Sequence, residues 1–315
     1  MLSILHTVLP VFLLVGAGFC AVRFKVFPDS SVAGLVLFTQ NFAMPSLLFL
    51  GLYRLDFDAV FDPRLIFSFY FGAIFSFALG YFVARKLFRR RPGESVAIGF
   101  AGLFSNAVLL GLPIMERAYG AESLAANYAL IAIHAPVCYF IGITAMEIAR
   151  ADGRSFGATA RVTIAAMFRN TITIACGFGV LMNFLAIPLP VPVESAVGML
   201  ASATLPVALF GLGGVLTRYR IRSSLGEALA ITFIATIIHP SIAFVLTHHV
   251  FGLDPAFVRS ATVMAAMGPG ANAYVFASMY DRATGEVAST VVIATAVSAV
   301  TAAGWLWLLG GAAIG

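Results

Sequence analysis

The sequence has very few charged residues. Asp, Glu, Lys and Arg make up 10% of its 315 residues, whereas hydrophobic residues make up 61% and the mean hydropathy is +0.98. Soluble domains carry about 25% charged residues, so this chain has too little polar surface to cover a globule in water. The scarcity of charge excludes a soluble protein and predicts a chain embedded in a lipid bilayer.

Cysteine is also scarce, with only Cys20, Cys138 and Cys176 present. Each lies inside an apolar segment, their number is odd, and their spacing fits no metal site. We interpret them as small buried hydrophobic residues. The sequence therefore predicts no disulfide framework, no metal centre and no cofactor.

Long segments without any charged residue recur along the chain. Each reaches the roughly 20 residues that a helix needs to cross about 30 Å of hydrocarbon. The strands of membrane barrels are about 10 residues long and alternate in polarity, so these segments exclude a barrel. The sequence predicts an all-α polytopic membrane protein with ten transmembrane helices, within residues 1–22, 30–53, 65–84, 95–115, 123–146, 170–193, 195–217, 228–253, 260–280 and 287–315.

The basic residues are distributed unevenly between these segments. If every segment crosses the membrane, all of the 19 Lys and Arg residues except Arg54, Arg64, Arg117 and Arg259 fall on one side. Basic loops remain in the cytoplasm. We therefore expect a multi-pass protein of the cytoplasmic membrane with both termini outside. The net charge of +5 is this bias summed over the loops, and anionic lipid headgroups would also favour it. It requires no nucleic-acid partner.

Two sequence patterns occur twice, at nearly equal separations. Pro-x-x-Leu-Phe begins at Pro45 and again at Pro206, and Asn-Ala begins at Asn106 and again at Asn272. A repeat unit of five spans has an odd number of membrane crossings, so its second copy enters the membrane from the opposite side, as in many secondary transporters. The sequence predicts a first five-helix repeat in residues 1–152, a cytoplasmic linker with a surface helix in residues 153–169, and a second, inverted five-helix repeat in residues 170–315.

Helix-breaking residues interrupt the fourth and ninth predicted spans at corresponding places. A proline removes one backbone hydrogen bond and clashes with the preceding turn, so polar groups are freed where no water is available. Asparagine is a good N-cap for a second half-helix, and the start of a helix favours an anion. We expect the two broken helices to cross near the midplane. Ser105, Asn106, Gly270 and Asn272 are the predicted substrate-binding residues there, and Gly111, Pro113, Gly268 and Pro269 form the predicted crossover.

Several polar residues in the spans have two interpretations. Asn41, beside Gln40, either binds substrate in the same cavity or bonds to a neighbouring helix. His134 and His239 are either packed, backbone-bonded histidines or protonatable groups of the site. The breaks also have a structural alternative, because membrane helices tolerate prolines and glycines as kinks. Their matched positions in the two halves favour a binding site.

No Asp, Glu, Lys or Arg lies in the middle of any predicted span. This argues against transport driven through an intramembrane carboxylate and against a charged selectivity ring. A membrane-embedded enzyme would need a nucleophile or two acids at matched depth, and the sequence offers neither. An enzyme is therefore a remote alternative, and helix ends and asparagines are the expected recognition chemistry.

The sequence resembles the auxin efflux carrier family of transporters, and is similar to its bacterial branch of malonate transporters. The resemblance implies ten helices in two inverted repeats, a scaffold domain, a transport domain and a substrate site where spans 4 and 9 cross. Two places depart from the family pattern. Thr171 follows Asn170 where many relatives have proline. Many relatives also carry a basic residue in span 8, and the nearest candidate for it in this chain is His239. The matching residues are Asn41 to Leu50, Phe104 to Asn106, Gly111 to Pro113, Asn170, Gly177, Asn183, Pro206 to Gly213, Pro269 and Ala273 to Tyr280.

The leading expectation is a secondary carrier, not an enzyme, that moves a small organic anion by alternating access. A carboxylate or dicarboxylate such as malonate would be held at the crossover. The alternative within transport is a passive facilitator or channel for weak acids. A proton or sodium ion as coupling ion and a homodimer are left open.

Overall fold

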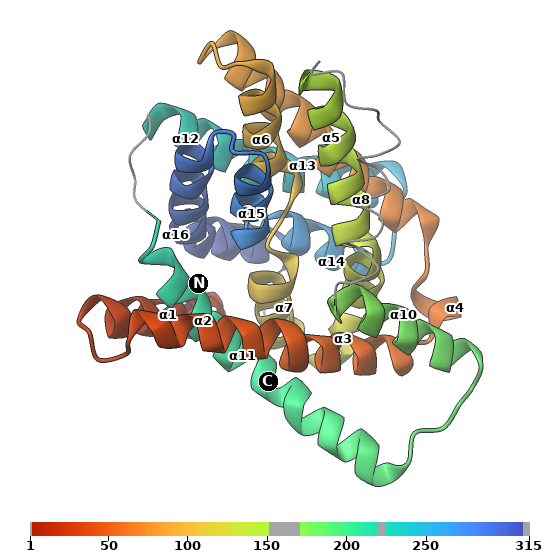
Figure 1. The fold of residues 1–315 in the computed structure, drawn as a ribbon. Coiled ribbons are helices and arrows are strands. Elements are labelled where there is room, and N and C mark those ends of the chain that lie inside the picture. The colour runs from red at the N-terminus through yellow and green to blue at the C-terminus, as the bar shows by residue number, and fades with distance from the viewer. Residues whose placement is uncertain (1, 151–170, 220–224, 311–315) are drawn as a thin grey trace.

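The chain is an all-helical, multi-pass membrane protein. The computed structural model describes residues 2–150, 171–219 and 225–310 (Figure 1), and no strand occurs among them. Within these described residues, seven helical stretches are long and apolar enough to cross a membrane. The predicted spans 95–115 and 260–280 are interrupted, and span 170–193 yields a helix of 14 residues. The predicted surface helix within 153–169 and Asn170 lie outside the described residues.

The first part of the chain forms membrane-length helices and shorter pieces between them. Proline begins several of these helices, because its missing N–H costs nothing in the first turn. The elements are α1 (Leu2–Arg23), α2 (Asp29–Phe38), η1 (Thr39–Ala43), α3 (Met44–Tyr53), α4 (Phe57–Val60), α5 (Pro63–Lys86), α6 (Pro92–Leu103), η2 (Ala107–Gly111), α7 (Leu112–Tyr119), η3 (Ala121–Leu124) and α8 (Ala125–Arg150).

The second part begins after the linker. Its first helix ends at Phe184, and the segment 187–190 that follows contains Pro188 and Pro190 and is not helical. The elements are α10 (Thr171–Phe184), α11 (Val191–Leu216), α12 (Leu225–Phe233), η4 (Ile234–Ile238), α13 (His239–Phe244), η5 (Val245–Val250), α14 (Pro255–Ala265), α15 (Ala271–Met279) and α16 (Thr284–Leu308).

The helices pack in two groups, and each group takes helices from both parts of the chain. In the first group α1 packs against α11, and α3 packs against α10 and α11. In the second group α5 packs against α6 and α13, α8 against α6, and α12 and α15 against α16. Figure 1 shows the first group as the lower layer and the second group above it. Each group is thus built from both predicted repeats.

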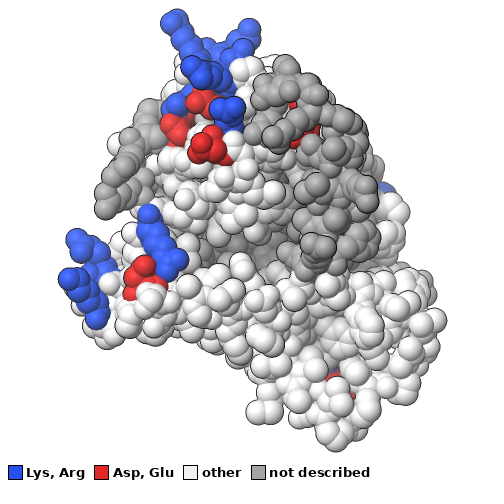
Figure 2. All heavy atoms as spheres, viewed as in Figure 1, with Lys and Arg blue, Asp and Glu red and all other residues white. Residues whose placement is uncertain are grey.

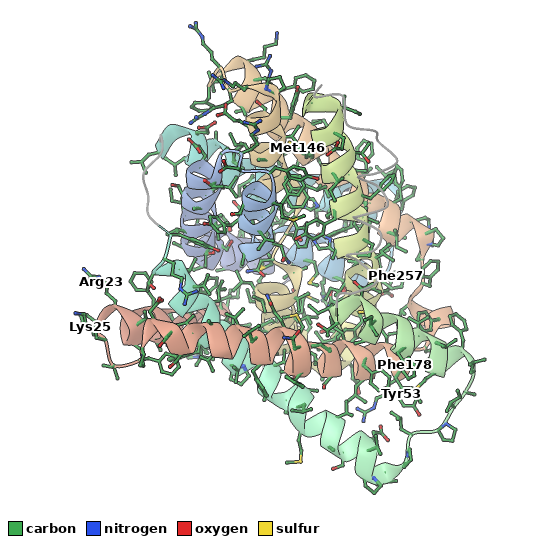
Figure 3. All side chains as sticks on the ribbon, viewed as in Figure 1. Arg23, Lys25, Tyr53, Met146, Phe178 and Phe257 are labelled. Carbon is green, nitrogen blue, oxygen red and sulfur yellow. The ribbon has the colours of Figure 1, made fainter. Side chains whose placement is uncertain are left out.

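Charged side chains are concentrated at the ends of these layers. On the face drawn in Figure 2, Lys and Arg gather near the start of α6 and beside the α1–α2 turn. Most of the other described residues on this face are uncharged and drawn white. Figure 3 places Arg23 and Lys25 at one end of the first group and Tyr53 and Phe178 toward its other end. The long uncharged stretch between the ends suits contact with hydrocarbon.

Three prolines explain three π-helical segments inside the spans. The segments end at Ala43, Gly111 and Ile238, and in each case proline follows two positions later, as Pro45, Pro113 and Pro240. Proline cannot donate to the carbonyl four residues earlier, so the preceding N–H bonds one residue further back. At Met44, for example, the N–H bonds Thr39 O. These widened turns lie in η1, η2 and η4.

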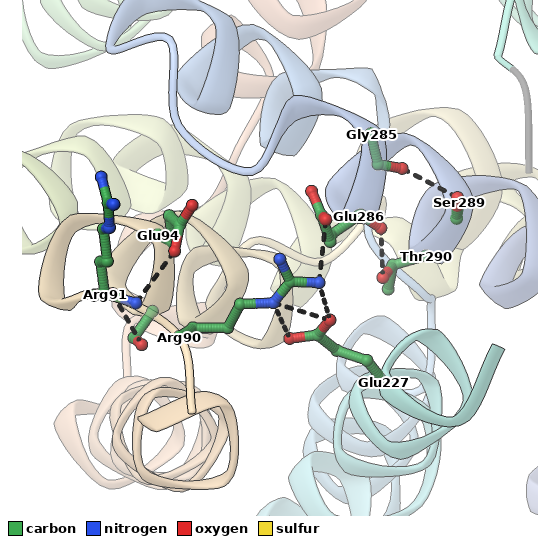
Figure 4. A network of polar contacts seen from close by, with 9 residues as sticks. Arg90, Arg91, Glu94, Glu227, Gly285, Glu286, Ser289 and Thr290 are labelled. Atoms are coloured by element: carbon green, nitrogen blue, oxygen red, sulfur yellow. Dashed lines mark hydrogen bonds and ion pairs between the residues drawn. The ribbon is translucent and has the colours of Figure 1, made fainter. Parts of the chain in front are cut away.

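A buried ion network joins the start of α6 to α12 and α16. The Arg90 guanidinium lies 2.7 Å from Glu227 Oε2 and 2.9 Å from Glu286 Oε1 (Figure 4). The Glu227 side chain is only 1% exposed. Breaking a buried pair leaves an uncompensated charge, which is far more costly than losing a pair on the surface.

Replacing Arg90 by alanine is therefore expected to destabilise the protein strongly. Stranding the Glu227 carboxylate should cost roughly 3–5 kcal/mol. Arg54→Ala is the matched control, because it removes the Arg54–Glu194 pair, whose side chains are 59% and 33% exposed, and should cost about 0–1 kcal/mol. Thermal unfolding of the purified proteins in detergent measures both. Equal melting temperatures for the two variants would contradict this role of Arg90.

Candidate functional site

The two breaks lie side by side in the second helix group. The chain leaves α6 at Leu103, and residues 104–106 are not helical. It leaves α14 at Ala265, turns at residues 266–267, and is not helical at residues 268–270. Ser105 and Pro269 form an isolated antiparallel β-bridge, and the Asn106 N–H donates to Gly268 O at 3.0 Å. Peptide groups freed by one break are thus satisfied in part by the other.

Glycines allow this close approach. A Cβ at Gly268 would lie 2.7 Å from Ala294 Cβ and 3.1 Å from Ala294 C, and a Cβ at Gly270 would lie 2.9 Å from Asn106 Cγ. The Gly268 N–H also donates to Ser298 Oγ at 3.0 Å. The crossing therefore has no room for even a methyl group at these two positions.

Two helices begin at the crossing. The first helical N–H bonds after the first break run from Leu110 and Gly111 to Asn106 O, and after the second break the Ala273 N–H bonds Gly270 O. The first amides of each helix have no acceptor within that helix and carry its positive end. Two positive helix ends therefore meet beside the breaks.

A cavity of about 530 Å³ opens at this point between the two helix groups, and its size suits a small molecule. No Asp, Glu, Lys or Arg is among the described residues that line it. The polar lining consists of Thr39, Gln40, Asn41, Ser105, Asn106, His134, Tyr139, Thr171, Thr173 and Asn272, and Gly270 also lines the cavity. The apolar lining includes Val36, Met44, Phe104, Val108, Leu109, Ile131, Leu212 and Val275.

Two polar groups of the crossing are buried and unpartnered. Ser105 is 4% exposed and Asn106 is 6% exposed, and neither Ser105 Oγ nor Asn106 Nδ2 has a hydrogen-bond partner. Leaving such a group unsatisfied costs roughly 1–3 kcal/mol. Both residues line the cavity, so a ligand or water in the cavity is the available partner.

The capping predicted for the asparagines is wrong in detail. Asn106 occupies the N-cap position of η2, but its side chain makes no capping hydrogen bond. The N-cap of α15 is Gly270, which has extended backbone, and Asn272 lies inside the first turn. Asn272 is exposed and lines the cavity. Neither asparagine side chain caps the helix that begins beside it, so both side chains are available to a ligand.

The other predicted site residues fall into two sets. Asn41 lines the cavity from the first helix group. Of the predicted crossover residues, Gly268 and Pro269 lie in the crossing, whereas Gly111 and Pro113 lie beyond it, where η2 joins α7. None of these four lines the cavity. At Gly111 a Cβ would lie 2.6 Å from Met264 Sδ, so this glycine is also a point of close contact.

The two histidines have different positions. His134 lines the cavity, and its Nε2 lies 3.3 Å from Ser105 O. His239 does not line the cavity; its Nε2 lies 3.1 Å from Phe69 O, and its ring packs where Gly72 leaves space. His239 fits the interpretation of a packed, backbone-bonded histidine, whereas His134 is placed beside the crossing.

Thr39 and Thr171 line the cavity, a role that the sequence analysis predicted for neither of them. The Thr171 hydroxyl lies 3.1 Å from Gln40 O and 3.2 Å from Asn41 Oδ1. Pro45 was the sequence signal that could have indicated a distorted turn at Thr39. No local sequence pattern relates Thr171 to Asn41, which lies 130 positions away. Within the described ranges, no group of three or more His, Cys, Asp or Glu side chains could hold a metal ion.

Comparison with known proteins gives full-length matches to transporters. A family described as membrane transport protein matches residues 3–306. The "Putative malonate transporter" of Rhizobium meliloti strain 1021 is 26% identical over 310 residues, covering 98% of this chain and 97% of that protein. An uncharacterized transporter of Methanothermobacter thermautotrophicus is 26% identical over 308 residues, with 95% and 96% covered. The uncharacterized transporter YfdV of Escherichia coli K12 is 21% identical over 304 residues, again with 95% and 96% covered. The chain belongs to this membrane transport protein family, the auxin efflux carrier family that its sequence resembles.

Proposed function

We propose that the protein is a secondary carrier that moves a small organic anion across the cytoplasmic membrane, with the substrate carboxylate bound at the crossing. The observation that carries this proposal is the pair of unpartnered groups, Ser105 Oγ and Asn106 Nδ2, at a cavity where two helices begin. Hydroxyl and amide donors beside positive helix ends are a site for an anion. Family and relatives are transporters, which agrees with binding without chemistry.

The absence of charge from the described cavity lining favours a substrate with one negative charge. Helix ends supply only about half a unit charge each. A second unbalanced charge would have to be buried without a cation, which is costly. Malonate is the substrate in the name of one relative, and we propose that a dicarboxylate of this kind enters with one carboxyl group protonated.

Alternating access is supported by the position of the cavity between the two helix groups. Asn41 belongs to the first group, and Asn106 and Asn272 belong to the second. A movement of one group relative to the other would change the access to all three. We propose that the groups are the scaffold and the moving part of ten helices in two inverted repeats, 1–152 and 170–315, with both termini outside.

Countertransport in proteoliposomes tests this function. Vesicles preloaded with one unlabelled carboxylate should accelerate the uptake of the same labelled carboxylate, because a carrier returns faster when it is loaded. A panel of short mono- and dicarboxylates including malonate finds the substrate, and imposed pH and sodium gradients test both coupling ions. Uptake without acceleration would indicate a passive facilitator, and no carboxylate uptake at all would refute an anion carrier.

A further inference from the structure

We propose that the cavity has a second polar subsite, made by Thr39, Asn41 and Thr171, which binds an uncharged hydrogen-bonding group at the far end of the substrate. The inference rests on the proposed function, because it assumes that a carboxylate occupies the crossing. It defines the substrate class more narrowly: a carboxylate with a distal hydroxyl or protonated carboxyl group, in contrast to a plain alkyl carboxylate. We call these three residues the distal subsite.

The distal subsite belongs to the first helix group, whereas Ser105 and Asn106 belong to the second. Thr39 and Asn41 lie on η1, the widened turn before Pro45, and Thr171 begins α10. All of them line the same cavity as Asn106. A substrate held at the crossing therefore shares its cavity with polar groups from the other helix group.

Thr171 holds the Asn41 amide in one orientation. Its hydroxyl donates to Asn41 Oδ1 at 3.2 Å and to Gln40 O at 3.1 Å, so the two oxygens share one hydroxyl proton. With Oδ1 engaged, the Asn41 NH₂ group is the part of the amide left to donate to a ligand. Thr171 acts through Asn41, and we class it as a positioning residue.

Thr39 supplies an independent indication of a ligand. It is 5% exposed, lines the cavity, and its Oγ1 has no hydrogen-bond partner. A buried hydroxyl without a partner costs roughly 1–3 kcal/mol. A substrate group that accepts from or donates to this hydroxyl would recover that cost.

The chemistry of the distal subsite selects an uncharged group. Hydroxyl and amide groups both donate and accept, and no cation lies among the described residues of the cavity to balance a second carboxylate. A methyl group there would leave Thr39 and the Asn41 amide unsatisfied. A site built to hydrogen-bond a hydroxyl discriminates against the analogue that lacks it.

The test compares matched pairs of short carboxylates in proteoliposomes, first propionate and 3-hydroxypropionate. The wild-type protein should show a KM roughly 2- to 10-fold lower for the hydroxylated member, the worth of about one hydrogen bond. Asn41→Ala and Thr171→Val should bring this ratio close to one. Thr171→Ser, which keeps the hydroxyl, should restore the wild-type ratio.

Thr301→Val is the matched control, because Thr301 bonds only the Val297 carbonyl of its own helix and does not line the cavity. Its ratio should equal that of the wild type. A wild-type ratio near one for every transported pair, or an unchanged ratio in Asn41→Ala, would overturn the distal subsite while the carrier function stands. If no carboxylate is transported, the proposed function fails, and this inference fails with it.

Discussion

Replacing Asn106 by alanine is expected to lower kcat/KM for carboxylate uptake about 10- to 100-fold. The substitution removes the buried Nδ2 donor and keeps the main-chain N–H that bonds Gly268 O, so the crossing itself remains. A hydrogen bond to a charged group contributes roughly 1.5–3 kcal/mol, which corresponds to this range. Initial uptake rates in proteoliposomes over a range of substrate concentrations measure the loss.

Asn127→Ala provides the control for removing a buried asparagine. Asn127 is fully buried on α8, donates to Ser123 O at 3.2 Å and does not line the cavity. Its replacement should leave the KM unchanged. Asn106→Asp keeps the shape of the side chain but places a negative charge beside the proposed carboxylate, and it should abolish uptake. Wild-type kinetics in Asn106→Ala would remove Asn106 from the site.

Gly268→Ala is expected to abolish transport almost completely. The new methyl group would lie 2.7 Å from Ala294 Cβ and 3.1 Å from Ala294 C, so the extended segment would have to move away from α16. This shift would break the bond from the Asn106 N–H to Gly268 O and separate the two helix starts. Overpacking alone costs roughly 1–3 kcal/mol.

The control for this variant is Gly304→Ala in α16. A Cβ at Gly304 meets nothing within 4 Å, so this variant should transport at the wild-type rate. Uptake by both variants is normalised to the amount of folded protein, measured by size-exclusion chromatography. If Gly268→Ala transported like Gly304→Ala, the close crossing would not be needed for function.

The sequence allowed the prediction of the second break from its proline, because proline acts locally and Pro269 lies in the break itself. In the first span the break lies at residues 104–106, directly before η2, whereas Pro113 lies further along and widens that turn. Two breaks in an apolar environment have few ways to satisfy their peptide groups other than each other. The N-cap of α15 could not be predicted in the same way. Gly270 takes that position because the Asn106 side chain leaves no room for a Cβ there, and this contact depends on the fold.

The division of the helices into two groups also could not be predicted from the hydrophobic periodicity of the sequence. In a bilayer both the lipid-facing and the buried sides of a helix are apolar, so hydrophobic pattern does not identify the packed face. Thr171 illustrates the consequence: its hydroxyl meets Asn41 only because α10 packs beside α3 and η1. Likewise, His134 lines the cavity and His239 does not, and this difference depends on how the helices pack.

Selective stabilisation of the purified protein by anions tests the central claim most directly. A ligand that binds only the folded state at 100 times its Kd adds about 2.7 kcal/mol of stability. We predict that at least one short carboxylate raises the melting temperature in a concentration-dependent manner, that the amine of matched size does not, and that Asn106→Ala weakens the effect. Equal stabilisation by carboxylate and amine, or no stabilisation by any carboxylate, would contradict an anion site at the crossing.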